Sequence, residues 1–139
     1  MAVIVSACLL GENCKYNGKN NYNEKVMQYI KGKKVISVCP EVEGGLPTPR
    51  VPSEIVNGIV TNKEGENVDA QFRKGVAVIM ERIKDEDIDC VILQSRSPSC
   101  GSKEIYDGTF SKKLIAGQGV FAKAMIEAGF KVIDVEDLQ

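Results

Sequence analysis

The fold of this chain is decided by one segment, Cys90-Val91-Ile92-Leu93-Gln94-Ser95-Arg96-Ser97-Pro98-Ser99-Cys100-Gly101. Its first part is a short apolar run with β-branched residues, and turn-forming residues bound it, which predicts a buried strand. Its second part is a polar loop that contains Cys100. A buried strand that opens into a polar loop at its carboxyl end is typical of the ligand-binding edge of an open parallel sheet.

Two other stretches of the chain repeat this arrangement. Val3-Ile4-Val5 leads into Cys8, and Val35-Ile36-Ser37-Val38 leads into Cys39. The carboxyl ends of parallel strands meet at one edge of a sheet. The sequence therefore predicts that Cys8, Cys39 and Cys100 converge in one crevice.

Strand and helix patterns alternate along the whole chain. Apolar runs predict strands over residues 2–7, 34–38, 90–93 and 131–135, and helical spacing predicts helices over 23–31, 68–84 and 120–128. This β-α-β alternation predicts a three-layer α/β fold with a mostly parallel, Rossmann-like sheet of about four strands. A length of 139 residues with 43% apolar residues suits one core, so we expect a single domain over residues 1–139.

Turn residues predict the connections between these elements. Four prolines and two adjacent glycines in residues 40–52 predict an irregular loop that contains neither a regular helix nor a central strand. Asn57-Gly58 predicts a small hairpin over residues 55–60, and Asp107-Gly108 predicts a tight turn. Asn67 is the expected cap of the longest helix.

Composition and charge exclude several classes of partner. The net charge is −1 and the basic residues are dispersed, so no electrostatic attraction to nucleic acid or to an anionic membrane is expected. No apolar run reaches the roughly 18 residues of a membrane span. Only seven residues, none basic, precede Cys8, so no secretory signal is predicted. A domain of this size does not need disulfides, so its five cysteines suit the reducing cytoplasm. The sequence does not determine the oligomeric state.

The absence of histidine restricts the chemistry of any catalytic or metal site. It removes the usual general base and the commonest zinc ligand. The spacings of the cysteines match neither paired zinc knuckles nor a ferredoxin run. Each cysteine taken alone could be structural, but soft thiolates from separate strand ends favour an iron-sulfur cluster, with zinc as the alternative.

Several ordered motifs cover nearly the whole chain. They are Ser6-Ala7-Cys8-Leu9-Leu10-Gly11 with Tyr16 and Gly18, Cys39-Pro40-Glu41 with Gly44-Gly45-Leu46 and Pro49-Arg50, Ser97-Pro98-Ser99-Cys100-Gly101, and Tyr106-Asp107-Gly108-Thr109-Phe110. Together they resemble the motifs of the thiouracil desulfidase family, long catalogued as a bacterial domain of unknown function.

This resemblance implies a function, a cofactor and a set of site residues. The function is the non-redox desulfuration of a small thiolated pyrimidine, such as 2-thiouracil to uracil, with release of sulfide. The cofactor is a 4Fe-4S cluster held by Cys8, Cys39 and Cys100, with substrate sulfur bound at its open iron. Glu41 falls on the catalytic acid/base position and Ser97 on the position that orients the substrate.

Alternatives stay open for several of these residues. Cys14 is a possible fourth ligand that would close the open iron, whereas Cys90 inside a strand is most simply a buried apolar residue. Glu41 could instead cap a turn or pair with Arg50. Arg50 and Arg96 could bind substrate oxygens or form surface ion pairs.

The segment 117–122 fits the G-x-G-x-x-A pattern of dinucleotide-binding sites. Too little chain follows it for the second strand that such a site needs, so the start of a helix is the favoured interpretation. Free amides at this helix start could still touch a bound ligand. A second function is also considered for the chain: instead of an enzyme, it could be a non-catalytic metal-binding or sulfur-sensing domain.

Overall fold

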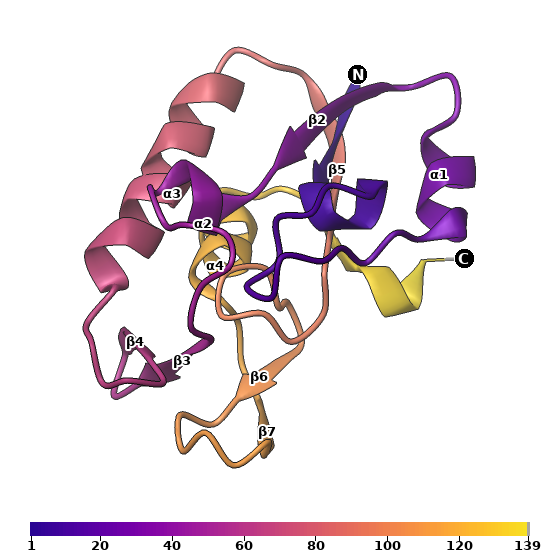
Figure 1. Ribbon diagram of the computed structural model, residues 1–139. Coiled ribbons are helices and arrows are strands. Elements are labelled where there is room, and N and C mark those ends of the chain that lie inside the picture. Colours follow the sequence, from indigo (N-terminus) through magenta and orange to yellow (C-terminus); the bar gives the residue numbers. More distant parts are fainter. Residues whose placement is uncertain (139) are drawn as a thin grey trace.

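The computed structural model describes residues 1–138, and its central feature is a four-stranded parallel sheet with the strand order β2-β1-β5-β8 (Figure 1). The strands are β1 (Ala2–Ser6), β2 (Lys34–Val38), β5 (Ile88–Leu93) and β8 (Val132–Asp134). In the register of the sheet, Val3 pairs with Val35 on one side and with Cys90 on the other. The predicted Rossmann-like parallel sheet is confirmed, with slightly shorter first and last strands.

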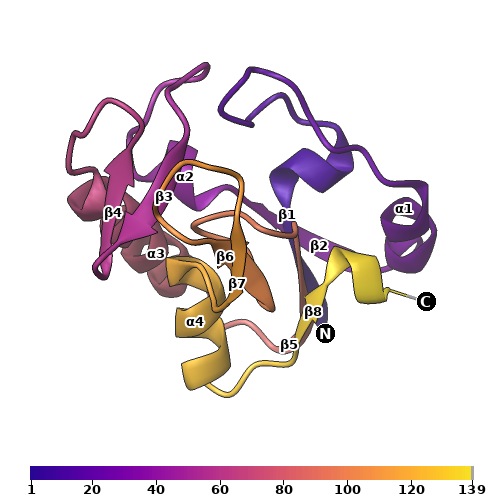
Figure 2. The same ribbon diagram turned by 90° about the horizontal axis from the view of Figure 1, so that it is seen from below.

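Helices cover both faces of the sheet. α3 (Asp69–Ile83) and α4 (Val120–Glu127) lie on one face, and α1 (Glu24–Ile30) lies on the other (Figures 1 and 2). Two short 3-10 helices, η1 (Ala7–Leu10) and η2 (Val135–Asp137), adjoin the α1 layer. None of the helices in residues 1–138 is long and apolar enough to span a membrane.

Strand β1 is buried along its whole length because it has a core on each side. Ile4 packs into the core under α3 and α4 with Ile79 and Phe121. Val3 packs into the opposite core with Val26 of α1. Successive side chains of a strand point to opposite faces, so a central parallel strand is apolar at every position.

The predicted helix starts are close to those observed. Asn23 caps α1, and its side chain accepts a hydrogen bond from the N–H of Val26 at 3.2 Å. In α3 the cap position is occupied by Val68, so the prediction of Asn67 as the cap is wrong by one residue. The Asn67 side chain nevertheless accepts a hydrogen bond from the N–H of Asp69 at 2.9 Å.

The predicted irregular loop over residues 40–52 begins with a single helical turn, α2 (Pro40–Glu43). The prediction of no regular helix is wrong for these residues, because proline is compatible with the first position of a helix. α2 packs closely against α3, where a Cβ on Gly75 would lie 1.8 Å from the carbonyl oxygen of Pro40. This close approach of two backbones fixes Glu41 near the end of β2.

Two antiparallel hairpins complete the fold. β3 (Ser53–Val56) and β4 (Ile59–Asn62) join at Asn57-Gly58, which confirms the predicted hairpin. β6 (Glu104–Tyr106) and β7 (Leu114–Ala116) form the second hairpin. The predicted turn at Asp107-Gly108 lies within its longer loop, residues 107–113, where Asp107 Oδ1 accepts the N–H of Thr109 at 3.0 Å.

Candidate active site

The candidate site lies where the strand order reverses. The chain passes from β1 outward to β2 and then crosses to β5 on the other side of β1. In open α/β sheets, ligands bind outside the carboxyl ends of the strands at such a point. Cys8 follows β1 within η1, Cys39 directly follows β2, and Cys100 lies in the loop after β5.

Four of the five cysteines gather at this edge of the sheet. The Cys14 thiol lies close to the thiols of both Cys8 and Cys39, and the Cys39 thiol donates to the Cys14 carbonyl oxygen at 3.9 Å. Cys39 is in turn near enough to Cys100 for their charges to interact. Cys90 does not belong to this group: it is buried in β5, as predicted, with its Sγ 3.5 Å from the Tyr29 hydroxyl.

Burial and contact between thiols raise the pKa values of Cys14, Cys39 and Cys100. The pKa of Cys100 is raised to about 12 by burial, against hydrogen bonds from Ser6 and Ser99 that lower it. The pKa of Cys39 is raised by its hydrogen bond with Cys14 and by burial. For Cys14, the hydrogen bond with Cys39 lowers the pKa, but the bond with Cys8 and burial outweigh it and raise the pKa to about 11. Binding of a metal would therefore displace protons from these thiols.

The donor set fits an iron-sulfur cluster. Asn21 Nδ2 donates to Cys8 Sγ at 3.7 Å, and Ser99 Oγ lies 3.7 Å from Cys100 Sγ. Hydrogen bonds to ligand sulfurs are a recurring feature of protein-bound clusters. Within residues 1–138, no group of three or more cysteine, aspartate or glutamate side chains is arranged around a single-ion position. Soft thiolates from several strand ends suit an iron-sulfur cluster, with zinc as the alternative.

Glu41 links α2 to the Cys100 loop. Its side chain is 15% exposed, and its Oε1 accepts a hydrogen bond from Arg50 Nε at 3.1 Å. Its Oε2 accepts one from Ser99 Oγ at 2.9 Å. Since Ser99 Oγ also lies 3.7 Å from Cys100 Sγ, a single hydroxyl connects the carboxylate to a cysteine of the site.

Ser97 shapes the loop around Cys100. Its Oγ accepts the backbone N–H groups of Ser99 at 3.1 Å and of Cys100 at 3.0 Å, and it lies 2.9 Å from Ser99 Oγ. Ser97 therefore reaches Glu41 only through Ser99. Sequence reasoning missed Ser99 as a site residue, although its position directly before Cys100 was the available signal.

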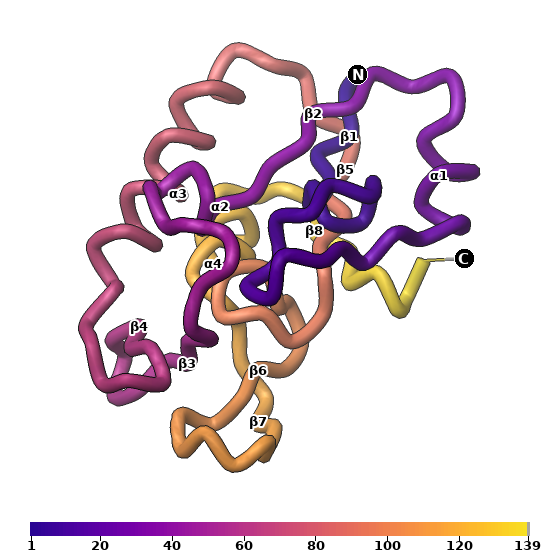
Figure 3. Tube along the Cα trace, viewed as in Figure 1, coloured from indigo at the N-terminus to yellow at the C-terminus, as the bar shows by residue number. Residues whose placement is uncertain are grey.

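Arg50 is a buried clamp in this region and not a surface residue. Its side chain is 7% exposed. Besides Glu41, it donates to the carbonyl oxygen of Cys14 at 2.8 Å, and its own N–H donates to the carbonyl oxygen of Tyr16 at 2.7 Å. These bonds join segments 11–23 and 40–52, whose traces run side by side in Figure 3. The pairing of Glu41 with Arg50 is confirmed, whereas Arg96 forms surface ion pairs with Glu104 and Glu136.

The G-x-G-x-x-A pattern marks the start of α4, as the favoured interpretation predicted. The N–H of Val120 donates to the carbonyl oxygen of Pro98 at 2.9 Å, and the next two amides donate to the carbonyl oxygen of Ser99. A Cβ on Gly119 would lie 2.5 Å from the carbonyl carbon of Ser99. The expectation of free amides for a ligand is therefore wrong, because these amides hold the Cys100 loop.

Comparisons with known proteins agree on one family. Residues 3–137 match the 2-thiouracil desulfurase family. The chain belongs to this family. It is 39% identical over 146 residues to YbbK of Bacillus subtilis (strain 168), an uncharacterized protein, with 98% of this chain and 97% of YbbK covered. Its structure is similar to that of the 4Fe-4S-dependent thiouracil desulfidase TudS, with a TM-score of 0.92 at 34% identity over 99% of this chain and 92% of that chain.

Membership of the 2-thiouracil desulfurase family confirms the resemblance found in the sequence. The chain is an enzyme that acts on a carbon–sulfur bond. This supports the predicted enzymatic function and not the alternative of a non-catalytic sensing domain. The similarity to TudS also confirms the predicted α/β fold.

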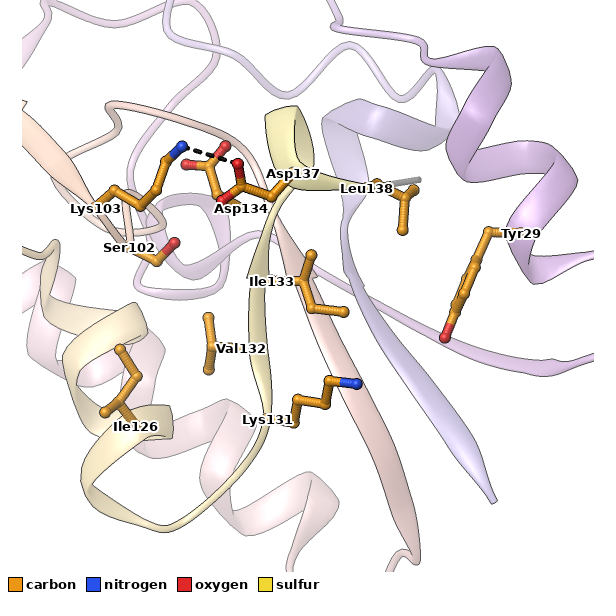
Figure 4. Close-up of a pocket in the computed structure, with 10 residues that line it drawn as sticks. All are labelled: Tyr29, Ser102, Lys103, Ile126, Lys131, Val132, Ile133, Asp134, Asp137 and Leu138. Carbon is orange, nitrogen blue, oxygen red and sulfur yellow. Dashed lines mark hydrogen bonds and ion pairs between the residues drawn. The ribbon is translucent and has the colours of Figure 1, made fainter.

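A separate hollow of this desulfurase lies away from the cysteines. It measures about 510 Å³ and runs along the edge strand β8, between Ile126 on one side and Tyr29 on the other (Figure 4). Lys103 and Asp137 form an ion pair at its rim, with Nζ and Oδ1 3.1 Å apart. None of the clustered cysteines and neither residue of the Glu41–Arg50 pair lines it.

Replacement of Arg50 by methionine should lower the free energy of unfolding by about 3 to 5 kcal/mol, because it removes the opposite charge from the largely buried Glu41 carboxylate and the closest donor from the Cys14 carbonyl. Urea denaturation of the apoprotein measures this loss. Arg73→Met is the matched control, since Arg73 pairs with Asp69 on the exposed face of α3. It should cost no more than about 0.5 kcal/mol. Equal losses in the two variants would contradict the role of Arg50 as a buried clamp.

Proposed function

We propose that this desulfurase converts a small thiolated pyrimidine, such as 2-thiouracil, to its oxo counterpart and releases sulfide. The observation that carries the proposal is the link from Glu41 through Ser99 to Cys100, which puts a largely buried carboxylate near the thiol of Cys100. The family match and the similarity to TudS, a 4Fe-4S-dependent thiouracil desulfidase, support the same reaction.

The proposed cofactor is a 4Fe-4S cluster held by Cys8, Cys39 and Cys100. Three ligands would leave one iron without a protein ligand, and the bound cluster would supply this iron as a soft Lewis acid for the thiocarbonyl sulfur. Asn21 would donate a hydrogen bond to the Cys8 sulfur, and the Ser99 hydroxyl would lie beside the Cys100 sulfur. Deprotonation of the three thiols would accompany loading of the cluster.

Glu41 is the proposed proton shuttle. Arg50 and Ser99 each hold one of its carboxylate oxygens, so the carboxylate has a fixed orientation before substrate binds. As water adds to the thiocarbonyl carbon, Glu41 would take a proton from the water and then return it to the departing sulfur. Ser97 would orient the substrate through Ser99, since its oxygen accepts two backbone N–H groups and its hydroxyl lies 2.9 Å from Ser99 Oγ.

The reaction needs no redox cofactor. Replacing C=S by C=O with water leaves the oxidation state of the carbon unchanged, and the products are the oxo-pyrimidine and hydrogen sulfide. We further propose that residues 1–139 act as a single domain in the cytoplasm, where a reducing environment keeps the five free thiols available. The partner would be the free thiolated base and not nucleic acid or membrane.

Anaerobic reconstitution with iron and sulfide, followed by addition of 2-thiouracil, tests this function. The thiocarbonyl absorbance should fall while uracil and sulfide appear in equal amounts, without any electron donor. Steady absorbance in the presence of an intact cluster would contradict the proposal. So would a decrease that occurs only when a reductant is added.

A further inference from the structure

Cys14 is a fourth thiol of the site that the proposed reaction does not use. It packs with Cys8 in the core on the α1 side, and its carbonyl oxygen accepts the thiol of Cys39 at 3.9 Å. Its own thiol contacts the thiols of both residues. Any group held between Cys8 and Cys39 would therefore lie against the Cys14 side chain.

The backbone around Cys14 differs from that around the other three thiols. Cys8, Cys39 and Cys100 are placed by the ends of β1, β2 and β5, whose backbones belong to one hydrogen-bonded sheet. Cys14 lies in segment 11–23, which contains no regular helix or strand, and it is only half-buried next to the exposed Asn13. Arg50 holds the carbonyl oxygen of Cys14 at 2.8 Å, so the backbone of Cys14 stays in place. The thiol can still leave by rotation about the Cα–Cβ bond of Cys14, while the other three ligands stay where they are.

We propose that Cys14 is a displaceable fourth ligand, which binds the iron left free by Cys8, Cys39 and Cys100 until a thiocarbonyl sulfur takes its place. This inference rests on the proposed function. In the exchange one iron–sulfur bond breaks and another forms, and the Cys14 thiolate takes up a proton as it leaves. No electron is transferred and no further reactant is needed.

A Cys14 thiolate bound to the open iron would make the site selective for sulfur-containing substrates. A soft iron site prefers sulfur to oxygen, so a thiocarbonyl sulfur can displace Cys14 whereas the carbonyl oxygen of the product cannot. Return of Cys14 would then help to expel the oxo-pyrimidine. The same thiolate would exclude water from the iron between turnovers.

Mössbauer spectra of protein reconstituted with ⁵⁷Fe test this assignment. Wild-type protein without substrate should show four irons in all-sulfur coordination, and Cys14→Ala should show one iron with a distinct isomer shift. Cyanide should bind the Cys14→Ala cluster at least about tenfold more tightly, because it no longer has to displace a thiolate. Cys90→Ala, which removes a buried thiol outside the site, should match the wild type.

Two results would overturn the inference. Identical spectra and equal cyanide affinities in wild type and Cys14→Ala would show that Cys14 is not a ligand. Loss of the cluster in both Cys14→Ala and Cys14→Ser would show that it is an essential ligand and not a displaceable one. Turnover of 2-thiouracil by the same samples separates this inference from the proposed function. If the spectrum of Cys14→Ala differs from that of the wild type but no sample turns over 2-thiouracil, only the proposed function is refuted. If the samples turn over 2-thiouracil but the two spectra are the same, only the role of Cys14 is refuted.

Discussion

Serine in place of Cys8, Cys39 or Cys100 should abolish stable binding of the 4Fe-4S cluster, whereas serine in place of Cys14 or Cys90 should not. The first three residues follow three neighbouring strands and would each supply a thiolate that a hydroxyl cannot replace, because iron in such clusters is held by soft sulfur ligands. Iron and sulfide content after anaerobic reconstitution, together with the absorbance of the cluster, measures the effect.

The two control positions make this result specific. Cys90 is as buried as Cys100 but contacts Tyr29 on the α1 side of the sheet, so Cys90→Ser tests for a general effect of losing a buried thiol. Cys14→Ser tests a thiol that contacts the site without following a strand. Loss of the cluster in the Cys14 variant, with retention in one of the three strand-end variants, would overturn the ligand assignment.

Replacement of Glu41 by glutamine should leave the iron content normal and slow the chemical step by roughly 10² to 10⁴-fold. Glutamine keeps an oxygen for the Arg50 guanidinium, and the Ser99 hydroxyl can rotate to accept from the new amide. The shape of the site would thus be preserved while the group that transfers protons is lost. Single-turnover measurement of 2-thiouracil consumption per reconstituted cluster isolates the chemical step.

Glu43→Gln is the matched control on the same helical turn. The Glu43 side chain accepts the N–H of Cys39 at 3.2 Å and pairs with Arg82, whereas Ser99 Oγ bonds to Glu41. The variant should keep the rate of the chemical step within about threefold of the wild type, since it removes no proton-transfer group from the site. Full turnover by Glu41→Gln would assign Glu41 a structural role only.

The sheet could be predicted because each of its strands has a recognisable pattern in a short stretch of sequence. Val3-Ile4-Val5 and Cys90-Val91-Ile92-Leu93 are short and continuously apolar, which fits strands buried on both faces. Cys8, Cys39 and Cys100 each come after a predicted strand. Because parallel strands end at the same edge of the sheet, their common location at that edge could be predicted as well. α2 could not be predicted in this way, because the prolines and glycines of residues 40–52 obscure a helix of one turn whose position depends on packing against Gly75.

The finer contacts of the site depend on tertiary structure. Nothing in Ser97-Pro98-Ser99 indicates which hydroxyl meets Glu41, since the turn of the loop decides that Ser97 bonds to backbone and Ser99 to the carboxylate. The sequence likewise left open whether Arg50 binds substrate or forms an ion pair. Its burial between segments 11–23 and 40–52 is visible only after the chain has folded.

The two sides of the site differ in how they can receive a cofactor. On one side, the first amides of α4 hold the carbonyl oxygens of Pro98 and Ser99, so the Cys100 loop cannot swing out unless the helix unwinds at its start. On the other side, segment 11–23 has exposed residues around Cys14 and no regular secondary structure. We therefore expect the apoprotein to fold first and the cluster to enter over segment 11–23, so that maturation of the enzyme depends on the accessibility of this segment.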